Sequence, residues 1–426
     1  MPDPFNRRHL IKRLGTIAAG AAFYSPLISC FDSKSIKTIL IVSGWQDINI
    51  GDIAHTPGLL NILQTFLPGT ELILWKKSQG SEVEQWLRSH FPAVKIVHGN
   101  IDTDFKVTSP EVSDAFSRSD LMIHGSGPSV VGSSNLEAWV RVTGKPFGIF
   151  GTTIQSIDEN LKRLLQKATF IFTRETASLE VLRKNGIDTG NQMFVPDATF
   201  FMHLRDDSRA DIFLKEKGLE HGKYICVIPR LRRTPYYLIR PGSYSEEQVR
   251  SIDTLNNSKK EEDHSKLREA IIAWVRETGN RVLICPEMTY QVDIMDELLL
   301  NSLPDDVKPF VTKRGYWLPD EAASVYSHAF AVLSFECHSP IISLVNGTPA
   351  FYLRQPEDTI KGQMYYDLGL SDWVFEIEEV TGSDIAERLR MIISDYDSAK
   401  VRVNKLRDSV RKIYETSAKI ILTPRS

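Results

Sequence analysis

The sequence predicts an α/β protein with two doubly wound, Rossmann-like domains that face one cleft, followed by C-terminal helices. From Ile36 onward, short apolar runs alternate with segments of helical period. The runs are continuously apolar, as in strands that crossover helices bury on both faces. The alternation weakens across the charged stretch 206–222 and then starts again. We therefore expect one domain over 36–205, a linker over 206–222 and a second domain over 223–383.

Length and composition fit this organisation. The chain has 426 residues, of which 42% are hydrophobic and 25% charged, so it exceeds a single small module and resembles ordinary globular proteins. Its 51 basic and 54 acidic side chains give a formal charge of −3, which provides no overall attraction for nucleic acid. Four cysteines in so long a chain exclude a disulfide-rich scaffold.

In the first domain, each helix is expected between two apolar runs, with Pro57 and Gly186 as helix start and stop signals. The expected strands are 37–42, 71–75, 94–98, 120–124, 146–150 and 169–173. The expected helices are 57–67, 81–91, 109–118, 133–143, 158–167 and 175–185.

The second domain repeats the pattern. The expected strands are 223–228, 281–285, 308–312, 330–335 and 349–353, with helices near 265–278, 291–302, 319–328 and 338–346. Residues 231–264 interrupt this domain without an apolar period, and we expect a long surface loop there. Tyr236, Tyr237 or Arg240 in this insertion would shape acceptor choice; a disordered loop is the alternative. The tail 384–426 has apolar residues at helical spacing and predicts one or two long helices.

Residues 1–30 are of a different kind. A basic start containing Arg7 and Arg8 is followed by an apolar, small-residue run and then Cys30, which is typical of a secretory signal. The arginine pair resembles a twin-arginine export signal. The residues before Cys30 resemble a lipobox, whose lipidated cysteine would anchor the protein to a membrane. We expect an exported, periplasmic or membrane-anchored lipoprotein; the alternative is a cytoplasmic protein that begins with an amphipathic helix.

Several loops of the first domain hold candidate binding residues. Asn49, Gly51 and Asp52 follow the first strand, where a helix N-terminus offers N–H groups to an anionic or polyhydroxyl ligand. The turn after the fourth strand contains Gly125 and Gly127, which either line a pocket or only form the turn. No GxGxxG or GxxxxGK[ST] pattern occurs in the first loop, which counts against a dinucleotide or P-loop site.

Arg174 and Asp197 are further candidates. Arg174 lies beside Glu175 at a strand–helix junction, and Asp197 follows a short apolar strand. Either residue would serve a ligand or the reaction. The alternatives are a surface ion pair for Arg174 and a turn for Asp197.

The second domain supplies the strongest candidates. Arg230 follows a strand, and a guanidinium binds carboxylate or phosphate through two hydrogen bonds. His338 lies between a buried strand and an apolar helix, where an imidazole can donate a proton near neutral pH; a capping or packing role is the alternative. Arginines cluster near the first of these positions, at Arg230, Arg232, Arg233 and Arg240, and predict a place for an anionic ligand.

In this order of features, the chain resembles the polysaccharide pyruvyl transferase family over about residues 36–370. The matching elements are Asn49-x-Gly51-Asp52, the glycine-rich turn 125–132, Arg174-Glu175-x-x-Ser178, Pro196-Asp197, Arg230, His338, Gly347-x-Pro349 and Lys361. The family usually has an arginine two residues before the histidine, where this chain has Glu336. Its usual glycine run is here broken to Gly125-Ser126-Gly127-Pro128.

The resemblance implies a fold similar to that of GT-B glycosyltransferases and transfer of a pyruvyl group from phosphoenolpyruvate to a cell-envelope sugar as a ketal. It implies that Arg230 holds the phosphate or carboxylate of the donor, and that His338 binds phosphate or protonates the methylene carbon. Asp52 or Asp197 is the candidate base, and Lys361 adds positive charge. Phosphoenolpyruvate would be a co-substrate. We expect a saccharide acceptor, and no other cofactor, no metal and no nucleic-acid partner.

Two alternatives keep this fold without phosphoenolpyruvate chemistry. One is an exported lipoprotein that binds glycans. The other is a different glycan transferase, including one that uses a nucleotide sugar, because a fold alone does not decide function.

Overall fold

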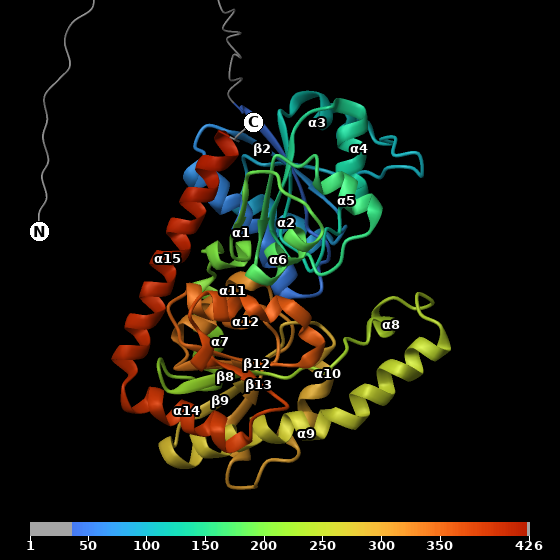
Figure 1. The fold of residues 1–426 in the computed structure, drawn as a ribbon. Helices are drawn as coiled ribbons and strands as arrows, with labels where there is room; N and C mark the ends of the chain where they lie inside the picture. Colours follow the sequence, from blue (N-terminus) through green and yellow to red (C-terminus); the bar gives the residue numbers. More distant parts are fainter. Residues whose placement is uncertain (1–35, 424–426) are drawn as a thin grey trace, which may run out of the picture. The chain divides into compact units, whose positions relative to one another are not determined.

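Two parallel sheets form the body of the protein in a computed structural model that describes residues 36–423 (Figure 1). The first sheet has seven strands in the order β3-β2-β1-β4-β5-β6-β7, and the second has six in the order β10-β9-β8-β11-β12-β13. The predicted fold class of two doubly wound α/β sheets followed by helices is confirmed. The predicted export signal, twin arginines and Cys30 lie outside the described residues.

The first sheet follows the apolar runs of the sequence. Its strands are β1 (Thr38–Ser43), β2 (Glu71–Lys76), β3 (Lys95–Val97), β4 (Leu121–His124), β5 (Phe147–Thr152), β6 (Phe170–Thr173) and β7 (Gln192–Phe194). The crossover helices are α1 (Ile50–Phe66), α2 (Ser81–His90), α3 (Pro110–Arg118), α4 (Ser133–Thr143), α5 (Glu159–Leu165) and α6 (Thr176–Lys184). Every residue of the central strand β1 is buried, as a strand covered on both faces requires.

The second sheet repeats this build. Its strands are β8 (Tyr224–Ile228), β9 (Arg281–Ile284), β10 (Val311–Lys313), β11 (Ala331–Ser334), β12 (Ala350–Arg354) and β13 (Val374–Glu376). The longer helices around it are α7 (Asp207–Lys217), α9 (Glu246–Thr278), α11 (Pro319–His328), α12 (His338–Val345), α14 (Gly382–Ser394) and α15 (Tyr396–Leu422). The helix α7 occupies most of the stretch that we expect to connect the two domains. The edge strand β13 is not among the strands expected from the sequence.

The first helix begins earlier than predicted. Pro57 lies inside α1 rather than at its start, because Asn49 caps the helix through hydrogen bonds that its side-chain oxygen accepts from the amides of Gly51 and Asp52. The polar first turn that seemed part of a loop is therefore helical, and it places Asp52 and His55 near the end of β1.

The loop predicted over 231–264 is wrong from Glu246 onward. The 33-residue helix α9 begins there, with Ser245 and Gln248 forming a capping box. Its N-terminal half is mostly polar and exposed, so it lacks the apolar stripe that reveals a helix packed on a core. Only 231–245 remain largely irregular, interrupted by the four-residue helix α8 (Tyr236–Ile239).

The two sheets belong to one compact unit and are joined by packing. One apolar cluster includes buried residues of both, and α15 (red in Figure 1) contacts α1, β6 and α12. The phenol of Tyr414 on α15 donates a 2.7 Å hydrogen bond to the backbone oxygen of Asp197. Within residues 36–423, no helix combines the length and apolar character needed to cross a membrane.

Candidate functional site

A polar cavity of about 300 Å³ lies where loops of both sheets meet. The acidic side chains in its lining are Asp52 and Glu336, and the basic ones are Arg174, Arg230, Arg240, His338 and Lys361. Parallel sheets place ligand sites at the carboxyl ends of their strands, and Arg174, Arg230 and Glu336 each follow such an end closely.

A short backbone bridge joins the two halves beside this cavity. Asn49 pairs with Met288 as an isolated antiparallel bridge. The amide of Ile50 donates a 2.8 Å bond to the oxygen of Glu287, and the amide of Thr289 donates a 3.0 Å bond to the oxygen of Ile48. These bonds hold the first turn of α1 against the segment that follows β9.

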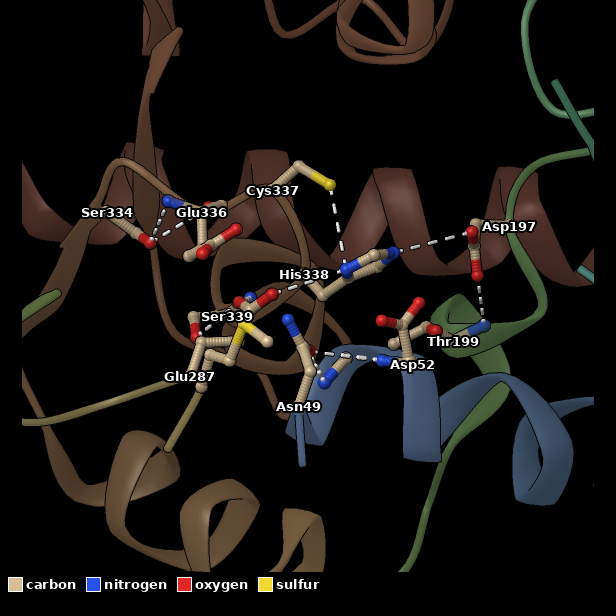
Figure 2. A network of polar contacts seen from close by, with 12 residues as sticks. Asn49, Asp52, Asp197, Thr199, Glu287, Ser334, Glu336, Cys337, His338 and Ser339 are labelled. Atoms are coloured by element: carbon tan, nitrogen blue, oxygen red, sulfur yellow. Dashed lines mark hydrogen bonds and ion pairs between the residues drawn. The ribbon is translucent and has the colours of Figure 1, made fainter. Parts of the chain in front are cut away.

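His338 lies between carboxylates from opposite sides of the site (Figure 2). Its Nδ1 is 3.3 Å from Oε1 of Glu287 and 3.6 Å from the sulfur of Cys337. The other oxygen of Glu287 accepts hydrogen bonds from the amide and hydroxyl of Ser339, at 2.6 and 2.8 Å. Glu287 thus fixes both the ring of His338 and the first turn of α12.

The Nε2 of His338 faces a second histidine. It lies 3.0 Å from Nε2 of His55, and His55 in turn lies 3.2 Å from Oδ2 of Asp197. Because two unprotonated nitrogens would repel at this distance, one of them donates a hydrogen bond to the other. Asp197 is fully buried and also accepts bonds from Arg174 and from the amide of Thr199.

The three groups His55, Asp197 and His338 are close enough to bind one metal ion. However, Arg174 already donates a 2.8 Å bond to the same Asp197 oxygen that the histidines face. The Nδ1 of His55 has no hydrogen-bond partner among the described residues, whereas a metal-bound histidine normally donates from its second nitrogen. These contacts favour a hydrogen-bonded cluster over a metal site.

The charges of this cluster reinforce each other. Burial alone would raise the pKa of Asp197, but His55 and His338 outweigh burial and hold it well below its ordinary value. Burial alone would lower the pKa of His338, but the Cys337 sulfur and the carboxylates of Asp197 and Glu287 raise it well above its ordinary value. His338 is therefore a cation near neutral pH, suited to bind a phosphate or to donate a proton.

Arg174 is held from three directions. Besides Asp197, its guanidinium donates a 2.7 Å bond to the hydroxyl of Thr153 and lies 3.7 Å from Glu175. Glu175 also accepts a hydrogen bond from Ser178, so the Arg174-Glu175-x-x-Ser178 motif forms one buried network. This network fixes Asp197 behind the histidines.

A second charged cluster surrounds Arg230. Its Nη1 donates a 2.6 Å bond to Asp358, and its Nε lies 3.4 Å from Glu336. Lys361 lies 2.9 Å from the same Asp358 oxygen, which is fully buried. Burial alone would raise the pKa of Asp358, but Arg230 and Lys361 lower it below its ordinary range. Asp358 therefore remains charged and compensates both cations.

Glu336 lies at the junction of the two clusters. Its Oε1 accepts a 2.7 Å hydrogen bond from the side-chain Nε2 of Gln291. Burial raises its pKa, Arg230 lowers it and Glu287 raises it again, with the net result of about 7. Glu336 therefore gains and loses its charge in the physiological range, directly beside Arg230.

Most predicted site residues lie in or beside the cavity. Asn49, Asp52, Arg174, Arg230, His338 and Lys361 line it. Asp197 lies one layer behind His338, at 3.7 Å from its Nε2. Of the predicted arginine cluster, Arg240 also lines the cavity, whereas Arg232 is paired with Asp263, Glu357 and Glu378, and Arg233 lies outside the lining.

The predicted glycines act through packing. The turn that contains Gly125 and Gly127 contributes Pro128 and Val131 to the cavity, while the two glycines pack beside Ser43 and Trp45. A methyl group on Gly51 would come within 2.3 Å of Nδ1 of His338. Gly51 therefore makes room for the histidine ring.

Replacing Gly51 with alanine is expected to displace His338 and to destabilise the protein by about 1–3 kcal/mol, the cost of overpacking a filled site. Urea denaturation measures the loss. Gly315→Ala is the matched control, because an added methyl group there meets nothing within 4 Å. Equal stability of the two variants would contradict this role of Gly51.

Three site residues were missed from the sequence: His55, Glu287 and Asp358. Glu287 follows the predicted strand 281–285 closely, and position at a strand end was a usable signal. His55 required the corrected start of α1. Asp358 lies in a short 3₁₀ segment, Pro356–Gly362, for which the sequence offered no distinctive pattern.

Comparisons with known proteins concern the family of the chain and its fold. A family model described as polysaccharide pyruvyl transferase matches residues 49–355. No curated protein matches the chain.

Similar solved structures include Anabaena HepE in complex with UDP-glucose, with 12% identity over 90% of this chain and 99% of that chain and a TM-score of 0.55. UDP-GlcNAc 2-epimerase from Neisseria meningitidis bound to UDP-GlcNAc has 12% identity, coverage of 90% and 98%, and a TM-score of 0.53. A glycosyltransferase from Rickettsia africae has 11% identity, coverage of 91% and 98%, and a TM-score of 0.57. These likenesses concern the fold and confirm its predicted GT-B-like arrangement.

Proposed function

The chain belongs to the polysaccharide pyruvyl transferase family, and we propose that it transfers a pyruvyl group from phosphoenolpyruvate to a cell-envelope saccharide as a ketal. The observation that carries this proposal is the convergence of Arg230, Lys361, His338 and Asp52 on one cavity. A donor with phosphate and carboxylate groups needs cations, and addition to its double bond needs an acid and a base.

The reaction we propose has two bond-forming steps. A sugar hydroxyl adds to C2 of phosphoenolpyruvate while His338 gives a proton to the methylene carbon, which becomes a methyl group. Asp52 accepts the proton of the attacking hydroxyl. A second hydroxyl of the sugar then forms its bond to C2 as the C2–O bond to phosphate breaks, and its proton leaves with the phosphate. Each acceptor therefore loses two hydroxyl protons, and the products are a ketal and inorganic phosphate.

The positions of the carboxylates support these assignments. Asp52 lines the cavity and is partly exposed, whereas Asp197 is fully buried against Arg174 and His55. We assign Asp52 as the base and Asp197 as a positioning residue that keeps His338 charged. Glu287 is the second positioning residue, because it holds Nδ1 of the same ring.

The direct test is to incubate the protein with phosphoenolpyruvate and cell-envelope saccharides and to measure phosphate release and ketal formation. Calorimetry with phosphoenolpyruvate alone measures donor binding. A wild-type protein that binds no phosphoenolpyruvate would refute the proposed function.

Glu336 favours an alternative function on the same fold, without phosphoenolpyruvate as the donor. Its carboxylate lies 3.4 Å from Arg230 and reduces the positive charge available to a donor. A glycan-binding protein, or a transferase with another donor, would need less of that charge. HepE and the Neisseria epimerase were solved with UDP-sugars, so UDP-glucose is the natural second ligand for the calorimetry. Binding of UDP-glucose without binding of phosphoenolpyruvate would support the alternative.

Glu336 makes donor binding depend on pH. Because its pKa is about 7, it is neutral below that pH and negative above it, so affinity for an anionic donor is expected to fall as pH rises from 6 to 8. Glu336→Gln removes this titration and retains an oxygen for Gln291. The donor phosphate itself titrates near pH 6 in both proteins. The dissociation constant of wild type is therefore divided by that of Glu336→Gln at each pH, which removes the contribution of the phosphate. A ratio independent of pH would contradict the prediction.

We further propose that the protein acts at the cell envelope, tethered through Cys30. The basic start, apolar run and cysteine of residues 1–30 support this location. Cys30→Ala is expected to move the protein from the membrane fraction to the soluble periplasmic fraction, because the anchoring acyl chains are lost. Immunoblots of fractionated cells measure the shift. Recovery of both forms in the cytoplasmic fraction would contradict an exported lipoprotein.

A further inference from the structure

The cations that line the cavity differ in whether their charge is already compensated. Arg174 is paired with Asp197, Arg230 with Asp358 and Glu336, and Lys361 with Asp358. Arg240 lines the same cavity, and among residues 36–423 no carboxylate forms an ion pair with it. It is therefore the arginine of the lining whose charge is available to an incoming anion.

Arg240 is held at the cavity by local contacts. Its amide donates a 2.7 Å bond to the oxygen of Tyr236, and its guanidinium lies 5.2 Å from the centre of the Tyr236 ring. The Tyr236 hydroxyl accepts a 3.4 Å bond from Gln46, which also donates to Asp52. Through these contacts the short segment around α8 reaches the first turn of α1.

The exposure of Arg240 indicates which end of a ligand it meets. The residue is exposed, while Arg230, His338 and Arg174 are buried. Arg240 therefore lies at the solvent side of the cavity. In the proposed reaction, phosphate is the group that must leave toward solvent, so the phosphate end of the donor faces this side.

We propose that Arg240 binds the phosphate group of the donor and supplies the positive charge that Glu336 withdraws from Arg230. This inference rests on the proposed function for the identity of the donor. It assigns a substrate-binding role to the segment between β8 and α9, which lies outside both sheets.

The test compares Arg240→Ala with wild type by calorimetry, using phosphoenolpyruvate and, separately, inorganic phosphate as probes. Loss of one charged hydrogen-bonding partner is expected to lower the affinity for both probes by about 10- to 100-fold. Arg233→Ala is the matched control, because Arg233 is an exposed arginine of the same segment outside the cavity lining. Arg240→Lys should bind the probes more tightly than Arg240→Ala and less tightly than wild type, because lysine keeps the charge but not the bidentate hydrogen bonds.

The outcomes separate the two proposals. Equal phosphoenolpyruvate affinity of Arg240→Ala and wild type would overturn the role of Arg240 and leave the proposed function standing. Wild-type binding of phosphate but not phosphoenolpyruvate, with the phosphate lost in Arg240→Ala, would refute the proposed function and retain the phosphate site. Wild-type binding of neither probe would overturn both. Because Arg240 is exposed, unchanged thermal unfolding of the variant confirms that a lost signal is local.

Discussion

Replacing His338 with alanine is expected to lower the rate of phosphate release by about 10²–10⁴-fold, the usual contribution of a positioned general acid. The ring is held by Glu287 at Nδ1 and faces His55 at Nε2. His338 itself lines the cavity, whereas His55 is not among the lining residues, so the loss of the His338 proton is expected to be felt directly at the donor. Single-turnover measurements with saturating phosphoenolpyruvate separate this chemical loss from weaker binding. Release at the wild-type rate would contradict the role of His338 as the acid.

Glu287→Gln provides the companion measurement. The amide keeps an oxygen for Ser339 but removes the negative charge that helps raise the pKa of His338. If Glu287 acts through His338, the variant loses activity at the alkaline end of the pH profile first, because the imidazolium loses its proton at lower pH. A merely structural role would lower activity equally at every pH.

Replacing Arg230 with alanine is expected to have the largest effect on stability. The substitution leaves Glu336 and the fully buried Asp358 without their main cation, and breaking a buried ion pair from one side costs about 3–5 kcal/mol. Donor binding is expected to fall as well, because Arg230 lines the cavity. Urea denaturation measures the first effect and calorimetry the second.

A double variant tests whether the stability lost in Arg230→Ala comes from leaving the Asp358 carboxylate without a cation. Arg230→Ala combined with Asp358→Asn should be less destabilised than the sum of the single variants, since the uncompensated charge is removed together with its partner. Strict additivity would contradict the pairing. Arg233→Ala, which removes an exposed arginine outside the cavity lining, should leave stability unchanged within about 0.5 kcal/mol.

The strands and the strand-end residues were predictable because burial on both faces leaves a direct record in the sequence. The runs at β1 and β8 show it, and the residues that follow them include Asn49 and Arg230. The C-terminal half of α9, with Leu267, Ile271 and Trp274 buried, lies where a helix was expected over 265–278. Its N-terminal half was not predictable, because a polar, exposed helical segment has no apolar period.

The sequence identified several residues of the site, but it did not indicate which of them contact each other. His338 was identifiable by its place after a buried strand, but its partners His55 and Glu287 come from positions 283 and 51 residues away. Their meeting depends on the way the halves pack, which no local pattern encodes. The same holds for Asp358, 128 residues from Arg230.

The backbone bridge between Asn49 and Met288 bears on which parts of the site can vary. Two main-chain hydrogen bonds join the halves beside Asp52 and Glu287, so backbone contacts rather than side chains set the spacing between these two segments. Among residues 36–423, the segment around α8 forms only local main-chain hydrogen bonds, and it contributes side chains at the rim of the cavity. Substitutions in the α8 segment therefore change the rim of the cavity without altering the backbone bonds that join the two halves.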